Sequence, residues 1–298
     1  MIIFKKEIPI QVIRLSIIGV LIIAIVAFKM ISSNMINAKI DKMLGSAKPY
    51  VTYGDTSMDL LGFDVHIHDI KLSIPNQKPL IVDEMVVKSF DTENAVPRYM
   101  NIKLERIQSD LAMLRSNPNL AAKLDILELK DIKSDLAVNY KFDKDEKMLD
   151  VKDLTLQVDN AGKISYKTKL YNIVAMEYFP MQINLAPQTI KFGTTSFHYE
   201  DDSFMEHMMK MKALDANQSV AVYKEDVLKR IQTNLAVAKA NSQSYETQLD
   251  EAMITFVQKP KSFDFGIEPS EPISLIMLNE AKSRDEILKK LQPKISAN

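Results

Sequence analysis

The sequence predicts an α+β fold with three parts: an N-terminal transmembrane helix, a curved antiparallel β-sheet meander and a C-terminal helical block. Three observations lead to this prediction. Residues 15–28 read LSIIGVLIIAIVAF, an apolar run without a charge. From residue 50 to residue 202, apolar and polar residues alternate with a period of two between Gly, Pro and Asn turns, which is typical of strands. From residue 203 the period becomes 3.6, which is typical of amphipathic helices.

The apolar run is long enough to cross a membrane. Extended to residues 8–31 it has 24 residues, or about 36 Å as a helix, against a hydrocarbon core of about 30 Å. The basic residues near its N-terminal end are Lys5, Lys6 and Arg14. Near its C-terminal end the sequence reads AFKM, which has bulky residues where a signal peptidase needs small ones. We expect an uncleaved signal anchor with its N-terminus in the cytoplasm. A cleaved signal peptide and a buried soluble helix are the alternatives.

The domain organisation follows from these patterns. We expect a cytoplasmic tail and anchor in residues 1–31, a helical stalk in 32–49 and the antiparallel sheet in 50–202. Residues 203–298 are expected to be a helical subdomain that packs on the sheet, with a helix break near Asn241 and short strands at FDFGIE and ISLIML. No second run of 18 apolar residues exists, so the sequence predicts one span.

One predicted strand changes its parity. Val65 and Ile67 share one side of an extended chain, whereas Ile70 and Leu72 fall on the other. A β-bulge between them would return all four side chains to the same face of the sheet. The alternation elsewhere in the sheet indicates one buried face and one face rich in Lys, Asp and Glu.

Composition excludes several classes of function. The chain has 38 Lys+Arg against 39 Asp+Glu, a balance that argues against a protein that coats nucleic acid. It has 7 Gly without a GxGxxG or P-loop pattern, which disfavours phosphate-binding nucleotide folds. It has no Cys, which excludes disulfides, thiol catalysis and thiolate metal sites. We therefore expect no enzyme, no catalytic residue and no cofactor.

Two clusters have the residue types of a metal site. His66 and His68 are two apart on a strand, so both rings point to one face, but a third ligand is needed and the other histidines are His198 and His207. His207 also lies beside Met208 in a Met-rich segment, and thioethers suit Cu(I). The alternatives are a polar sheet face for the first cluster and a flexible helical core stripe for the second, and we expect no metal.

A structural role is also expected just before the helical block. The letters EDD at residues 200–202 place negative charge at a helix N-terminus, where Asp202 or Ser203 can cap the helix. No GxSxG motif and no evident Ser–His pair point to a hydrolase.

Three segments carry a family resemblance: VTYGDTSMDLLGFDVHIHDIKLSIP, YKFDKDEKMLDVKDLTLQVDNAGKISYKTKLYNI and FVQKPKSFDFGIEPSEPISL. With the basic tail, single span and stalk before them, they resemble bacterial single-span envelope proteins of the AsmA-like and YdgA-like kind. The resemblance implies an inner-membrane anchor, a curved periplasmic β-sheet and a role in envelope lipid homeostasis. It supplies no catalytic residues, and typical AsmA-like proteins are far longer than this chain.

These expectations combine into a function. The chain is expected to be a non-enzymatic, single-pass protein of the bacterial inner membrane, with its bulk in the periplasm, that handles lipid or supports envelope integrity. The alternative is a structural accessory subunit of a larger envelope complex, such as a transporter, secretion system or motor, that docks through its helical block. Expected partners are membrane lipid, the inner membrane, and envelope proteins or a second copy, but no nucleic acid. A sheet of roughly nine strands is about 43 Å broad, too short to bridge two membranes alone.

Overall fold

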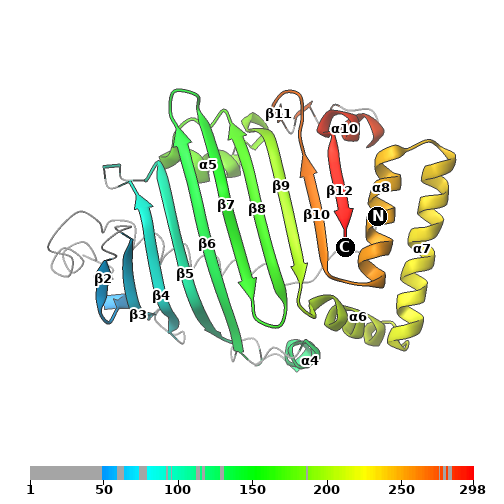
Figure 1. The fold of residues 1–298 in the computed structure, drawn as a ribbon, viewed down its shortest axis with the longest axis horizontal. Coiled ribbons are helices and arrows are strands. Elements are labelled where there is room, and N and C mark those ends of the chain that lie inside the picture. Colours follow the sequence, from blue (N-terminus) through cyan, green and yellow to red (C-terminus); the bar gives the residue numbers. More distant parts are fainter. Residues whose placement is uncertain are drawn as a thin grey trace.

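One antiparallel β-sheet of 12 strands organises the molecule (Figure 1). The computed structural model describes residues 49–58, 64–73, 79–91, 93–94, 96–111, 115, 118–127, 131–185, 187–274, 276–277, 280 and 284–298. Its strands are β1 (Val51–Thr52), β2 (Thr56–Met58), β3 (Val65–Leu72), β4 (Leu80–Phe90), β5 (Tyr99–Asp110), β6 (Asp131–Asp143), β7 (Met148–Val158), β8 (Gly162–Tyr171), β9 (Lys191–Asp201), β10 (Ser262–Ile267), β11 (Ile273–Ser274) and β12 (Pro293–Ala297).

The strand order is β1-β3-β4-β5-β6-β7-β8-β9-β10-β12, with β2 paired to β3 and β11 paired to β9. The helices lie in the connections and at one end of the sheet. They are α4 (Pro118–Ile126), η2 (Met176–Tyr178), α5 (Phe179–Leu185), η3 (Pro187–Thr189), α6 (Phe204–Asp215), α7 (Val220–Ala240), α8 (Ser244–Gln258) and α10 (Arg284–Leu291).

The predicted fold class is wrong. The prediction ended the sheet at residue 202 and gave the rest of the chain to a helical subdomain with short strands packed on the sheet. The strand predicted at FDFGIE is present as β10, but it pairs with β9, and β12 pairs with β10, so both belong to the same sheet. The helices α6 to α8 are therefore an insertion between two neighbouring strands. The pairing joins segments about sixty residues apart, and alternation within a strand carries no information on such a distant partner.

The transmembrane part of that prediction is not seen in the structure. None of the helices in the described ranges is long and apolar enough to span a membrane. The expected span at residues 8–31 lies outside the described residues, as does nearly all of the expected stalk.

The predicted parity change in β3 is confirmed. Val65, Ile67, Ile70 and Leu72 are all buried in one hydrophobic cluster, and Asp69 between them has a positive φ of 53°. Pairing with β4 keeps one register on both sides of Asp69, because β4 makes a matching change between its buried residues. The four side chains therefore reach one face without a register shift, and the β-bulge expected between them is not found in the pairing of β3 with its described neighbours.

Local chemistry explains where the inserted helices begin and end. The Ser219 hydroxyl accepts a hydrogen bond from Val222 N and caps α7. The break between α7 and α8 falls at residues 241–243, as predicted, where Ser242 has a φ of 54°. The predicted cap of α6 was wrong: Asp201, rather than Asp202 or the side chain of Ser203, accepts hydrogen bonds from Ser203 N at 3.2 Å and Met205 N at 2.9 Å.

Candidate functional site: an open apolar strip on the sheet

Two rows of apolar side chains run across nine strands of the sheet, from β3 to β12, on one face. Residues directly opposite each other in antiparallel strands point to the same face, so the strand registers define the rows. The first row is Ile67, Met85, Leu104, Leu136, Leu156, Ile164, Tyr199, Phe263 and Ala297, and the second row is Val65, Val87, Ile102, Val138, Leu154, Tyr166, Phe197, Phe265 and Ile295.

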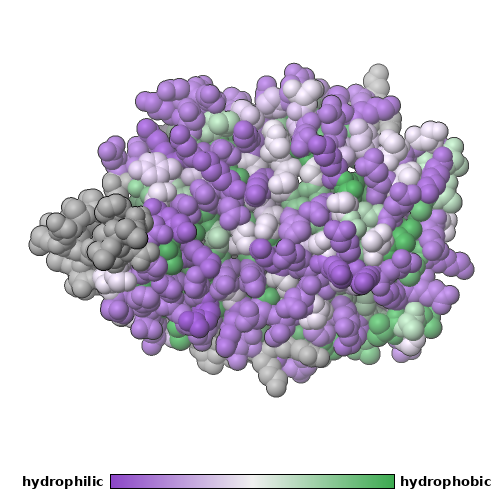
Figure 2. Space-filling model, in the orientation of Figure 1, coloured by the Kyte–Doolittle hydropathy of each residue, from purple (hydrophilic) through white to green (hydrophobic). Residues whose placement is uncertain are grey.

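The row between them points to the other face and is mostly polar: His66, Val86, Lys103, Ala137, Thr155, Ser165, His198, Asp264 and Ser296. The sheet is therefore two-sided over its whole breadth. Figure 2 shows a surface over the strands that is dominated by hydrophilic residues.

Burial along the apolar rows is uneven. Over β3, β4 and β5 the side chains form a closed core in which Leu104 is 0% exposed. Over β7 and β8 the same rows reach solvent, because Leu154 is 39% and Ile164 is 40% exposed. We call the partly exposed central part the open strip; it consists of Leu136, Val138, Leu154, Leu156, Ile164, Tyr166 and Phe197.

Packed side chains border the open strip on three sides. The core of β3, β4 and β5 lies on one side, with Leu136 and Val138 packed against it. On the opposite side Phe256 of α8 makes edge contacts with Tyr199 and Phe263, at ring distances of 5.9 Å and 5.8 Å.

The third border lies at the end of the strands where β8 turns toward β9. There the η2–α5 segment covers the apolar face through a cluster of Phe142, Leu149, Ile173, Met176 and Ile190. In Figure 1, α5 crosses β6 and β7 near that end of the sheet.

Polar groups near the open strip are satisfied within the protein. The hydroxyls of Thr168 and Thr195 are buried and lie 2.7 Å apart, and Thr195 Oγ1 also lies 3.2 Å from Gly193 O. The Tyr199 hydroxyl donates to Asp201 Oδ1 at 2.6 Å, and burial together with this carboxylate raises the pKa of Tyr199. The strip thus offers hydrocarbon contact without an unpaired group from these residues, a surface that suits an apolar ligand.

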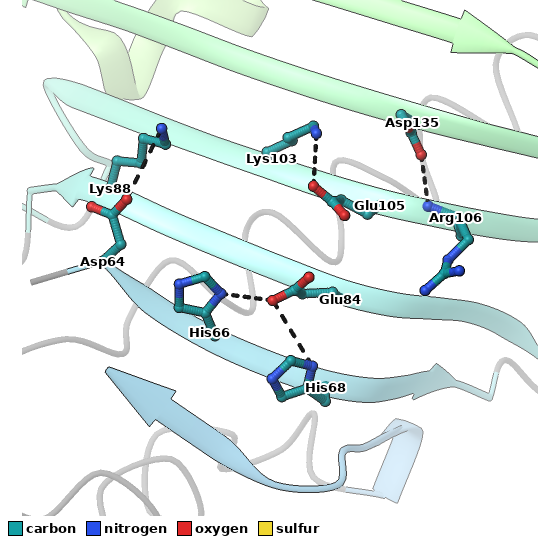
Figure 3. A network of polar contacts seen from close by, with 9 residues as sticks. All are labelled: Asp64, His66, His68, Glu84, Lys88, Lys103, Glu105, Arg106 and Asp135. Carbon is teal, nitrogen blue, oxygen red and sulfur yellow. Dashed lines mark hydrogen bonds and ion pairs between the residues drawn. The ribbon is translucent and has the colours of Figure 1, made fainter. Parts of the chain in front are cut away.

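The sequence-predicted metal candidates lie at opposite ends of the sheet. His66 and His68 lie on β3 and share one carboxylate: Glu84 Oε1 is 2.6 Å from His66 Nδ1 and 3.9 Å from His68 Nδ1 (Figure 3). His207 is buried on α6, beside Met208, and α6 follows β9, which five strands separate from β3. Within the described ranges, no group of three or more His, Asp or Glu side chains has the spacing of a metal site.

The polar face around His66 carries ion pairs and hydrogen bonds between charged residues. Lys103 Nζ lies 2.7 Å from Glu105, and Arg106 N donates to Asp135 Oδ1 at 2.7 Å (Figure 3). Each pair joins neighbours on one strand or on adjacent strands. These contacts keep the face polar and stabilise the pairing of neighbouring strands. They agree with the interpretation of His66 and His68 as part of a polar sheet face.

A cross-strand trio was missed in the sequence. Ser165, His198 and Asp264 are direct neighbours on β8, β9 and β10, and these residue types form hydrolase triads. His198 Nδ1 is 2.6 Å from Asp264, but its Nε2 is 3.0 Å from Glu200, while Ser165 Oγ lies 2.9 Å from Thr155 Oγ1. The imidazole is thus held between two carboxylates instead of facing the serine.

The pKa shifts of these residues support a structural role for His198 as a clamp, by which we mean a side chain that holds neighbouring strands together. The hydrogen bonds that His198 makes to the carboxylates of Glu200 and, to a smaller extent, Asp264 raise the pKa of His198, and the hydrogen bond from His198 lowers the pKa of Glu200. A base for serine would need a free imidazole nitrogen directed at the hydroxyl. We assign His198 to holding β9 and β10 together.

Comparison with known proteins adds one match. A family model described as "Uncharacterized protein" matches residues 155–298. This stretch begins within β7 and includes β8 to β12, the inserted helices and Ile164 of the open strip, while β1 to β6 lie outside it. No curated protein matches the chain.

Proposed function

We propose that this protein is a non-enzymatic lipid-handling protein of the bacterial envelope, which holds an acyl chain against the open strip. The observation that carries the proposal is the exposure of Leu154 and Ile164 within apolar rows whose members on β3 to β5 are buried. Exposed apolar surface that is continuous with a core and bordered by packed side chains is typical of ligand sites.

The dimensions of the strip fit this ligand. From β6 to β9 the strip spans three interstrand spacings, or about 14 Å at about 4.8 Å each. The acyl chains of one leaflet occupy about half of a hydrocarbon core of about 30 Å, or about 15 Å. A single acyl chain lying across the strands would therefore cover the strip. The same dimensions are far too small for a conduit between two membranes.

The sequence supports a location at a membrane. Residues 15–28 form an uncharged apolar run that favours a bilayer over water. We propose a single-pass protein of the inner membrane with its bulk in the periplasm, as the resemblance to AsmA-like and YdgA-like proteins also implies.

Lipid analysis of matched variants tests the proposal. Full-length protein would be purified in detergent, and bound lipid would be extracted and quantified by mass spectrometry. The double variant L154D/I164D introduces two aspartates on the strip, and its control Q157D/K167D introduces two aspartates on the same two strands but on the exposed polar face. Lipid that co-purifies with wild type and control but not with L154D/I164D supports the proposal. Absence of lipid from correctly folded wild type, or equal lipid in both variants, contradicts it.

A second candidate function is an accessory subunit of a larger envelope complex. Leu214, Val220 and Val222 are exposed at the junction of α6 and α7, and Val237 is exposed farther along α7. Figure 2 shows hydrophobic surface gathered where these helices lie. Mild detergent extraction followed by sizing and mass spectrometry separates the two functions: a stoichiometric protein partner favours the subunit, and a monomer with lipid favours the lipid-handling protein.

A further inference from the structure

The connection between β8 and β9 has one packed side and one exposed apolar side. Its inward side chains, Ile173, Met176 and Ile190, complete the cluster that borders the open strip. Its outward side chains are large, apolar and exposed: Val174, Tyr178, Met181 and Ile183. Four such residues lie within ten positions and leave apolar surface that the packing of the sheet does not need, and exposed apolar surface of this kind marks contact surfaces.

A hydrogen-bonded scaffold holds the outward side chains in place. The buried Gln182 amide donates to Asn172 O at 2.8 Å and to Thr189 Oγ1 at 3.0 Å, and its oxygen accepts from Val174 N at 3.2 Å. Asn172 Nδ2 also donates to Thr189 O at 2.9 Å. These bonds join the two ends of the connection, residues 172–190, so that it forms an ordered segment, which we call the platform. The exposed apolar side chains lie on it.

The composition of the platform suits a lipid surface. Between residues 172 and 190 the sole charged residue is Glu177, and Lys191 follows directly. Lys147 lies beside the platform, because its carbonyl oxygen accepts a hydrogen bond from Ile173 N at 3.0 Å. Tyrosine and aliphatic side chains with lysines at the margin are typical of segments that enter the interface of a bilayer.

We propose that this platform inserts into the surface of a lipid bilayer through Val174, Tyr178, Met181 and Ile183, and so brings the open strip to the membrane. The inference rests on the proposed lipid function and names how that site is loaded. The bilayer is the chosen occupant because the uncharged run of residues 15–28 ends only 20 residues before residue 49, where the described chain begins. Twenty residues span about 30 Å as a helix and at most about 70 Å extended, so a bilayer that holds the run is within reach of the domain.

Site-specific fluorescence tests the insertion. The chain has no Cys, so single-Cys variants can be labelled with the polarity-sensitive dye NBD. Met181→Cys probes the platform, and Val237→Cys is the matched control on α7, because the two side chains are 52% and 54% exposed. Full-length protein would be reconstituted into phosphatidylcholine vesicles with and without doxyl-labelled lipid. We expect a blue-shifted, doxyl-quenched emission at position 181 and a water-like, unquenched emission at position 237.

Three results would overturn the insertion. Water-like emission at both positions means that the platform stays in solvent, and equal quenching at both means unspecific adsorption. A blue shift at position 181 without doxyl quenching means that a protein surface, such as a second copy, covers the platform instead of lipid.

A loading assay separates this inference from the lipid site itself. The variant M181D/I183D changes the platform and leaves the open strip intact. We expect it to retain lipid supplied in detergent and to lose uptake of fluorescent lipid from vesicles. Normal uptake by M181D/I183D contradicts the insertion of the platform but leaves the lipid site of the open strip untouched. If L154D/I164D loses lipid while the NBD emission at position 181 stays blue-shifted and quenched, then lipid binding and membrane insertion belong to separate surfaces.

Discussion

Strands β3 to β5 and strands β6 to β8 have the same apolar alternation but different burial. Leu104 and Ile102 on β5 are essentially inaccessible, whereas Leu154 and Ile164, in the same two rows, are more than a third exposed. The first region is a closed hydrophobic core, and the second is a partly exposed surface made of the same kinds of apolar residues. Alternation therefore determines which face a side chain occupies, and the covering elements determine whether it is buried.

The difference separates stability from function. A closed core loses free energy when it loses volume, while a partly exposed residue in an open strip loses little. A ligand held on the strip, as proposed above, would therefore leave the core of β3 to β5 unaffected.

The largest effect is expected in the closed core. Leu104→Ala should lower the free energy of unfolding by about 2–5 kcal/mol, because it leaves a cavity among buried neighbours. The same change in the open strip, Leu154→Ala, should cost about 1 kcal/mol or less, because its side chain is already partly hydrated. Urea unfolding of both variants measures the contrast, and similar losses in both would show that the two regions form one core.

A second effect concerns the loop that joins β4 to β5. The buried Asp91 carboxylate accepts hydrogen bonds from Glu93 N at 3.0 Å, Asn94 N at 3.3 Å and Arg98 N at 2.9 Å. Asp91→Ala leaves these donors unpaired and should cost about 1–3 kcal/mol of unfolding free energy. Asp91→Asn keeps the shape and one acceptor oxygen, so it should cost less.

Acid should reveal the same carboxylate. Burial alone would raise the pKa of Asp91, but the hydrogen bonds from Arg98, Glu93 and Asn94 outweigh burial and lower it. A carboxylate with a lowered folded pKa stabilises the protein above its unfolded pKa, about 3.9, and this contribution is lost as the pH falls through the folded pKa. The stability difference between wild type and Asp91→Ala should therefore shrink below about pH 4. A difference that is constant with pH would show that the charge of Asp91 makes no contribution.

A third effect, of local extent, is expected at the platform beside the open strip. Gln182→Leu removes the amide that bonds Asn172 O, Thr189 Oγ1 and Val174 N, and should cost about 1–3 kcal/mol locally. Amide hydrogen exchange should rise in residues 172–190 and stay unchanged in β4 and β5. Increased exchange in β4 and β5 as well would contradict the independence of the two regions.

The smallest effect is expected from the clamp on the polar face. The raised pKa of His198 means that the charged imidazole stabilises the folded protein fully below its unfolded pKa of about 6.5, and that this contribution is lost as the pH rises through the folded pKa. Glu200 and Asp264 are partly exposed, so salt should weaken the effect. NMR titration of the four histidines should give His198 a pKa above the usual value. The His198 signal is assigned as the one that disappears in the variant His198→Asn. A normal pKa for that signal would contradict the clamp.

The sequence predicted local features well and distant pairings poorly. The parity change at Asp69 and the break between α7 and α8 followed from spacing within short segments, because periodicity is a local property. The return of β10 and β12 to the sheet did not, since no local pattern specifies a partner across the inserted helices. His198 and Asp264 became neighbours through that same unpredicted pairing.

The candidate site was predictable only in part. The alternation predicted one apolar face for the sheet, and Leu154 and Ile164 lie on it, but their exposure depends on which elements cover that face. The platform has one feature that is visible in the sequence: its nineteen residues, 172–190, carry one charge. Exposed apolar side chains in such a segment look like core residues until the packing is known.

Photo-crosslinking at the open strip tests the central claim most directly. Photoreactive p-benzoylphenylalanine would replace Ile164 in one variant and Lys167, on the same strand and the opposite face, in the control. Membranes that contain each variant would be irradiated, and the intact mass of the purified full chain would be measured. The account predicts a lipid adduct at position 164 and none at position 167; no adduct at position 164, or equal adducts at both, would contradict it.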